Sequence, residues 1–150
     1  LFLLYYPMLY FEESDKKNYA TIKKTRYAFI FLLLLVTVFL IIGRKYLYIL
    51  LGASQYLDYT DIFIYLAIAE FIRIVAGFYL IFRTFTMQNW YGTVAIGISA
   101  FMSLILNIIF IPKYGIYFAA FVQVFTAVIY FLITYFIAIR PERYYFKFAN

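Results

Sequence analysis

Residues 107–121 read NIIFIPKYGIYFAAF, in which the segment PKYG at positions 112–115 interrupts an otherwise apolar run. Proline removes a backbone donor and glycine tolerates a positive φ, so together they can end one helix and turn the chain. A connection this short holds the two flanking helices antiparallel and adjacent. The stretch therefore predicts a helical hairpin whose first helix ends at Pro112.

The sequence around this hairpin has the composition of a membrane protein. The chain of 150 residues is 67% hydrophobic and 13% charged, with a mean hydropathy of +0.90, whereas a soluble domain is about half apolar and about a quarter charged. A bilayer core of about 30 Å takes roughly 20 helical residues, and four apolar segments qualify, at 27–46, 62–82, 93–111 and 116–139. Because helices satisfy their own backbone groups in lipid, the predicted fold class is all-α, a polytopic membrane helical bundle.

The chain begins at Leu1 rather than Met, and its first ten residues resemble the end of a further apolar segment. We therefore expect a C-terminal piece of a longer protein, carrying the end of one transmembrane helix and then four complete ones. Between the first two segments, YLYILLGASQY (46–56) is apolar enough to lie in the membrane interface. Asp61, just before the second segment, is expected to cap that helix.

Lysine and arginine are divided unevenly between the two ends of the predicted segments. The poorer end has Arg44, Lys45 and Lys113, and the richer end has Lys16, Lys17, Lys23, Lys24, Arg26, Arg83, Arg140, Arg143 and Lys147. The positive-inside rule then puts the richer end and the C-terminus in the cytoplasm, and the turn at 112–115 on the outer side. These cations are expected to meet anionic lipid headgroups, and not nucleic acid.

Two charged residues, Glu70 and Arg73, lie inside the second segment. Both fall within about 3 Å of the bilayer centre at 1.5 Å per residue, where a charge costs roughly 2.5–3.5 kcal/mol. Their i,i+3 spacing puts them on one helix face, close enough to pair. The pair either fixes helix packing as a neutral unit, or lines a substrate path in which Arg73 attracts an anionic group and Glu70 holds Arg73 in place or exchanges an ion.

The third and fourth segments carry small or polar residues at every fourth position. They are Ala95, Ser99, Ser103 and Asn107 on the third segment, and Ala119, Gln123 and Ala127 on the fourth. Such stripes let membrane helices pack closely, with amide and hydroxyl groups bonding across the contact. We expect the packing seam of the hairpin here, and as the alternative a transport path lined by Asn107, Gln123 and Ser103.

Several kinds of chemistry have no residues to support them. The chain contains no cysteine, no histidine and no glycine pattern of the nucleotide-binding type. Thiol or imidazole nucleophiles and the usual zinc sites are therefore excluded from this chain. The expectation is a protein that is not an enzyme and that binds neither a metal nor a cofactor.

Three stretches, in their order, resemble the C-terminal part of polysaccharide flippases, the O-antigen and capsule exporters of the multidrug/oligosaccharidyl-lipid/polysaccharide superfamily. LNIIFIPKYG (106–115) followed by Ala119 and Ala120 is similar to that family's C-terminal hairpin. Residues 5–29 resemble its helix end and charged cytoplasmic loop, and ILLGASQYLDYTDIF (49–63) resembles the stretch before its next helix. Phe118 stands where the family commonly has glycine, which predicts a looser start to the last helix.

The resemblance implies a transporter of about twelve helices in two bundles, with residues 1–150 forming the C-terminal part of the second bundle. It also implies a bacterial inner-membrane location, and a partner, a lipid-linked oligosaccharide on polyprenyl diphosphate, that is flipped across the membrane by alternating access. The other partners would be the lipid bilayer and the N-terminal half of the same protein. Two alternatives remain, a cation-coupled multidrug antiporter of the same superfamily, and a membrane enzyme of envelope polysaccharide assembly.

Overall fold

The computed structural model describes residues 16–85 and 90–139 of the chain, and all of its elements in those ranges are helical. They are α2 (Lys16–Ile42), α3 (Arg44–Leu50), the 3-10 helix η1 (Ser54–Tyr59), α4 (Thr60–Phe85), α5 (Trp90–Tyr114), α6 (Ile116–Thr134) and the π-helical turn η2 (Tyr135–Ile139). The predicted all-α fold class is confirmed. The expected end of a preceding helix falls on residues 1–15, outside the described part.

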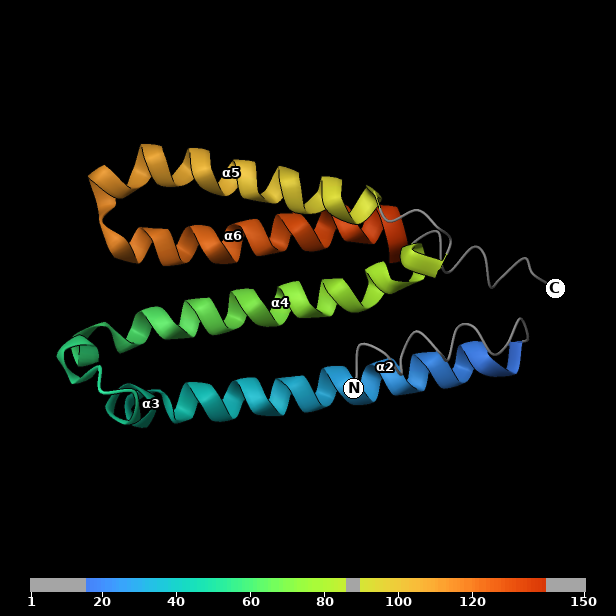
Figure 1. Ribbon diagram of the computed structural model, residues 1–150, viewed down its shortest axis with the longest axis horizontal. Helices are drawn as coiled ribbons and strands as arrows, with labels where there is room; N and C mark the ends of the chain where they lie inside the picture. The colour runs from blue at the N-terminus through green and yellow to red at the C-terminus, as the bar shows by residue number, and fades with distance from the viewer. Residues whose placement is uncertain (1–15, 86–89, 140–150) are drawn as a thin grey trace.

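Four helical stretches are long and apolar enough to cross a membrane. They are Lys23–Ile42, Gln55–Leu80, Trp90–Tyr114 and Ile116–Ile139. Figure 1 shows them lying side by side across the view, with successive helices running in opposite directions, α6 between α4 and α5, and α2 on the other side of α4. The start of α2, the end of α4, the start of α5 and the end of α6 share one end of the bundle, as the alternating segments predict.

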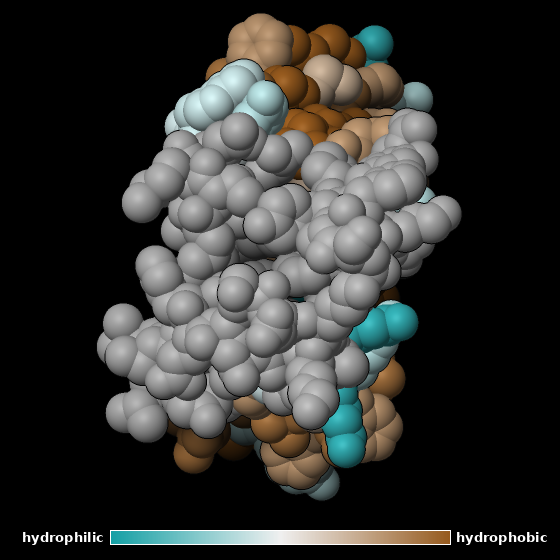
Figure 2. All heavy atoms as spheres, turned by 90° about the vertical axis from the view of Figure 1, so that its right-hand side faces the viewer, coloured by the Kyte–Doolittle hydropathy of each residue, from teal (hydrophilic) through white to brown (hydrophobic). Residues whose placement is uncertain are grey.

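Small residues form the buried contacts of this bundle. Ala69 and Ala76 on α4, Ala95 on α5 and Ala127 on α6 are completely buried. Because they lack bulk, neighbouring backbones approach closely, as in other membrane helix contacts. Large apolar side chains point outward instead, for example Phe101, which is 63% exposed. Seen from the end where α2 begins, the described side chains at the rim are mostly hydrophobic, with hydrophilic ones in a few patches (Figure 2).

The hairpin is confirmed, but its turn is tighter than predicted. α5 continues through Pro112 to Tyr114, so the expected helix end at Pro112 is wrong. A proline in the last turn removes one helical hydrogen bond only, and membrane helices tolerate that loss. Gly115 alone makes the turn, with φ 73° and ψ −168°, and its N–H donates to the Ile111 carbonyl at 2.9 Å.

The last helix does not start loosely. α6 begins at Ile116, directly after the turn. The Phe118 ring lies 4.9 Å from the Phe110 ring and 5.2 Å from the Tyr114 ring, measured between centroids. Aromatic contacts at these distances are stabilising, so Phe118 ties the two helices together at the turn, and the expectation of a looser helix start is wrong.

The first membrane helix ends earlier than predicted. α2 stops at Ile42 and not at residue 46, and α3 follows after Gly43. Arg44, the first residue of α3, holds the junction between α2 and α3 in place. Its Nη1 donates to the Ile41 carbonyl at 3.2 Å, and its Nη2 lies 3.0 Å from Asp61 Oδ1. Asp61 lies in the first turn of α4, one residue after the helix begins. It is therefore an ion-pair partner of Arg44, and not the helix cap that we expected.

Aromatic rings fix α2 against α4 at the opposite end of the bundle. Arg26 is only 4% exposed, and its guanidinium lies 4.4 Å from the centroid of the Tyr79 ring. Phe29 and Phe78 stack beside it at 6.4 Å. A desolvated cation–π contact of this kind contributes about 2 kcal/mol, so α2 is held to α4 at both ends.

Candidate functional site

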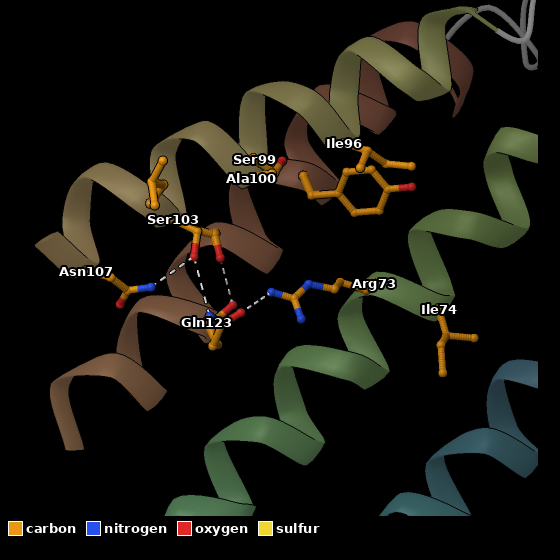
Figure 3. A pocket seen from close by; sticks show the side chains of 11 residues that line it. Arg73, Ile74, Ile96, Ser99, Ala100, Ser103, Asn107 and Gln123 are labelled. Carbon is orange, nitrogen blue, oxygen red and sulfur yellow. Dashed lines mark hydrogen bonds between the residues drawn. The ribbon is translucent and has the colours of Figure 1, made fainter. Parts of the chain in front are cut away.

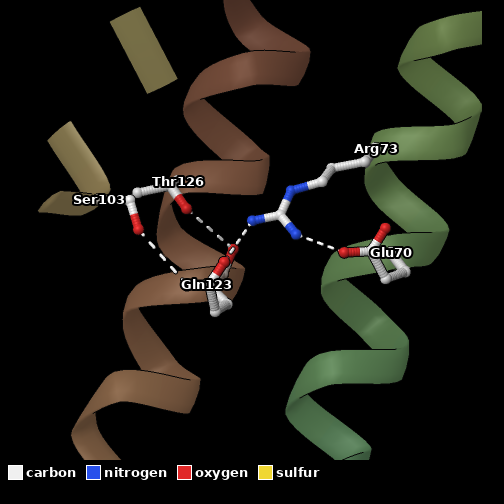
Figure 4. A network of polar contacts seen from close by, with 5 residues as sticks. All are labelled: Glu70, Arg73, Ser103, Gln123 and Thr126. Atoms are coloured by element: carbon white, nitrogen blue, oxygen red, sulfur yellow. Dashed lines mark hydrogen bonds and ion pairs between the residues drawn. The ribbon is translucent and has the colours of Figure 1, made fainter. Parts of the chain in front are cut away.

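Arg73 occupies the centre of the bundle, near the middle of α4, and binds two other side chains. Its Nη1 pairs with the Glu70 carboxylate one turn earlier, which confirms the predicted i,i+3 ion pair. Its Nη2 donates to Gln123 Oε1 on α6 at 2.5 Å. The planar guanidinium fork is suited to holding two acceptors at once. Arg73 therefore joins α4 to α6 through a charge-assisted bond (Figure 4).

Gln123 extends the connection from α6 to α5. Its Nε2 lies 3.4 Å from Ser103 Oγ, and Asn107 Nδ2 donates to the same oxygen at 3.3 Å. The result is a continuous set of polar contacts from Glu70 through Arg73, Gln123 and Ser103 to Asn107. We call these five residues the polar network, which crosses three of the four membrane-length helices.

Part of the polar network has unused hydrogen-bonding capacity. Asn107 Oδ1 is buried and has no hydrogen-bond partner among the described residues. A buried acceptor without a partner costs about 1–3 kcal/mol. Glu70 is the most open member, with 60% of its side chain exposed, whereas 31% of the Arg73 side chain is exposed. The network is therefore not closed, because the Glu70 side chain remains largely exposed and Asn107 Oδ1 lacks a partner.

A cavity of about 630 Å³ lies directly against the polar network. It is bounded by α4, α5 and α6, and the labelled side chains of Arg73, Ser103 and Gln123 point toward one another at its edge (Figure 3). Its lining residues are Arg73, Ile74, Ile96, Ser99, Ala100, Ser103, Leu104, Asn107, Gln123, Thr126 and Tyr130. The lining combines one guanidinium, two amides and several hydroxyls with apolar walls, which is typical of a binding site for a polar molecule.

Glu70 does not line this cavity, although it holds the arginine that does. Two charges near the middle of a membrane-length helix are costly, even when they neutralise each other. A guanidinium beside a polar cavity in surroundings of low dielectric attracts an anion more strongly than it would in water. The arrangement can therefore bind an anionic group at Arg73, with Glu70 in a positioning role.

The structure brings together the five candidate site residues, Glu70, Arg73, Ser103, Asn107 and Gln123. Glu70 and Arg73 pair as predicted. Ser103 and Gln123 bond across the hairpin, as a packing seam requires, while Ser103, Asn107 and Gln123 also line the cavity, as the alternative requires. Both interpretations of the stripes are compatible with this geometry.

Sequence reasoning missed the contact between Arg73 and Gln123, and it missed two lining residues of α6. Thr126 and Tyr130 are buried, and they follow Gln123 at the i+3 and i+7 positions of the same helix face. That spacing was visible in the sequence. The contact between Arg73 and Gln123 could not be predicted, because the two residues are 50 positions apart and nothing in the local sequence indicates which helix packs against α4.

A scan of protein-family models, a search of curated proteins and a search of solved structures each found no match for this chain.

Proposed function

We propose that this chain is the C-terminal part of the second bundle of a flippase, which moves a lipid-linked oligosaccharide across a bacterial inner membrane by alternating access. The observation that carries the proposal is Arg73, held by Glu70 and Gln123 beside a cavity with both polar and apolar lining, near the middle of membrane-length helices. Alternating access requires a substrate site near the middle of the membrane that can open to either side as one bundle rocks against the other.

The chemistry of the cavity suits both parts of such a substrate. A guanidinium presents several donors to phosphate oxygens, and so fits a polyprenyl diphosphate. The amide and hydroxyl groups of the lining fit sugar hydroxyls. Ile74, Ile96 and Leu104 form an apolar wall of the cavity and make no hydrogen bonds to a substrate. In binding sites of this kind, a few polar groups set the orientation of the ligand within apolar walls.

The same geometry favours a flippase over a cation-coupled antiporter. An antiporter for cationic drugs needs an acidic cavity, with Glu70 as the binding group. Here Glu70 lies outside the cavity lining and is paired with Arg73, and the charged group among the lining residues is the Arg73 guanidinium. An anionic substrate is therefore the better electrostatic match.

Deletion of the gene tests the proposal. We expect surface polysaccharide to disappear and its lipid-linked precursor to accumulate in the cytoplasmic leaflet, measured by accessibility of the sugar to an impermeant lectin in right-side-out and inverted vesicles. Re-expression of the intact gene should restore both. Unchanged surface polysaccharide would contradict the proposal, whereas a precursor that reaches the outer leaflet but is not polymerised would instead assign the protein to envelope assembly chemistry.

A further inference from the structure

A second cavity lies at the opposite end of α2 from its lysines, where α2 meets α3, and it has a different character. Its volume is about 620 Å³, and it is lined by Phe39, Leu40, Ile42, Gly43, Tyr46, Leu47, Ile49 and Leu50. None of these side chains is charged. We call it the α2–α3 groove. It is separate from the polar network, and nothing in the proposed function uses it.

The length of α2 places this groove at the edge of the hydrocarbon core. The apolar span runs from Lys23 to Ile42, which covers about 30 Å at 1.5 Å per residue and matches the bilayer core. Its upstream end is marked by Lys23 and Lys24, which suit the headgroup layer. Gly43 and α3 therefore lie in the headgroup layer of the other leaflet.

The direction of α3 fits the same location. In Figure 1, α2 lies across the view while α3 is seen nearly end-on, so α3 runs crosswise to the membrane-length helices. If those helices cross a bilayer, this direction lies along the bilayer plane. Its side chains are largely uncovered, with Tyr46 78% and Leu50 82% exposed. A short helix with bare apolar residues in this orientation is an interfacial helix, which rests on acyl chains.

A cation stands beside the groove. Lys45 is exposed, and it lies one helical turn from Ile49, on the same side of α3. Its neighbour Arg44 is already paired with Asp61. The described residues at this end of the bundle have a net positive charge, since three cations (Arg44, Lys45 and Lys113) outnumber two carboxylates (Asp58 and Asp61). Lys45 is therefore available to a phosphate at headgroup level.

We propose that the α2–α3 groove is a binding site for an anionic phospholipid, whose acyl chain lies against Phe39, Tyr46 and Leu50 and whose phosphate contacts Lys45. The apolar lining matches an acyl chain, and Lys45, the one unpaired cation at the groove edge among the described residues, matches one phosphate. Because the site depends on α2 and α3 alone, it stands whether or not the cavity at Arg73 carries a transport substrate.

Fluorescence quenching by brominated lipids tests this proposal in the intact protein. The reporter is Tyr46→Trp, in a background where Trp90, the single tryptophan of this sequence, and any tryptophan elsewhere in the protein are replaced by Phe. The protein is reconstituted into vesicles containing either brominated phosphatidylglycerol or brominated phosphatidylcholine at equal mole fraction. We expect about a fivefold preference for the anionic lipid, the effect of one lysine near the surface. Adding Lys45→Gln should abolish the preference while leaving quenching by the zwitterionic lipid unchanged.

A second reporter separates a specific site from ordinary lipid contact. Phe101→Trp places the fluorophore on an outward-facing side chain in the middle of α5, away from Lys45. Both brominated lipids should quench it equally, with or without Lys45→Gln. Equal quenching of the Tyr46→Trp reporter by the two lipids would overturn the proposal, because the groove would then hold bulk lipid only. Absence of quenching at position 46 would also overturn it, since another protein segment would then cover the groove.

Discussion

Replacing Arg73 by alanine is expected to abolish polysaccharide export while the protein remains in the membrane at its normal level. Arg73 is the only cation that lines the central cavity in the described part of the chain. Arg73 and an anionic group of the substrate would form a desolvated charge pair. Removing one partner of such a pair costs about 2–5 kcal/mol of binding free energy, which corresponds to roughly a 30- to 4,000-fold loss of affinity. The measurements are surface polysaccharide by antibody or lectin binding, and protein level by immunoblot of membranes.

Two further variants separate the charge of Arg73 from its hydrogen-bonding geometry and from the charge of Glu70. Arg73→Lys keeps the charge but loses the fork that binds Glu70 and Gln123 together, so export should be reduced and not abolished. Glu70→Gln keeps a side-chain acceptor for Arg73 and leaves the cavity cationic, so export should persist. Normal export by Arg73→Ala would remove Arg73 from the substrate path. Loss of the protein from the membrane would assign the ion pair to helix packing. Loss of polysaccharide export in Glu70→Gln alone would give the essential transport role to Glu70 and not to Arg73.

Gly115→Ala is expected to have the largest effect on stability. Gly115 adopts φ 73° and ψ −168°, a region that is essentially restricted to glycine. A side chain there costs about 1–3 kcal/mol through backbone strain, although a Cβ at this position would meet no other atom within 4 Å. Since this residue alone connects α5 to α6, the strain cannot be spread over a longer loop. The measurement is the midpoint of thermal unfolding in detergent.

Gly97→Ala is the matched control on the same hairpin. Gly97 lies inside α5, and a Cβ there would also meet nothing within 4 Å. Alanine is the better helix former by up to about 1 kcal/mol, so Gly97→Ala should unfold at the same temperature as the native protein or higher. If Gly115→Ala were as stable as Gly97→Ala, the single-residue turn would be wrong, and the hairpin would turn over a longer segment.

Hydropathy predicts most of this fold because each membrane helix must satisfy its own backbone. The segments 62–82, 93–111 and 116–139 each lie within the observed helical elements, with ends that differ by a few residues. The helix ends that depend on side chains were not predictable in this way. Ile42 ends α2 because Arg44 binds the Ile41 carbonyl and Asp61 together, and Asp61 lies 17 residues away in the sequence.

The five residues of the polar network were predictable from the sequence, and so was the pairing of Glu70 with Arg73, but the contact between Arg73 and Gln123 was not. Glu70 and Arg73 are conspicuous because charge is costly at mid-membrane, and Ser103, Asn107 and Gln123 are conspicuous by their spacing. The sequence contains no signal that α6 lies between α4 and α5. That arrangement brings Gln123 to Arg73, and turns two separate patterns into one polar network.

If the cavity beside Arg73 is part of a transport path, it must open to water on at least one side of the membrane, and cysteine accessibility measures this opening. The chain has no native cysteine, so Ser99→Cys places a thiol in the cavity lining, and Phe101→Cys places one at nearly the same depth on the outer face of α5. Any cysteine elsewhere in the protein is replaced first. A charged, membrane-impermeant thiol reagent reacts with thiolates in water only. We predict that it labels Ser99→Cys from at least one side of the membrane and leaves Phe101→Cys unlabelled. A Ser99→Cys variant as inert as Phe101→Cys would contradict the account.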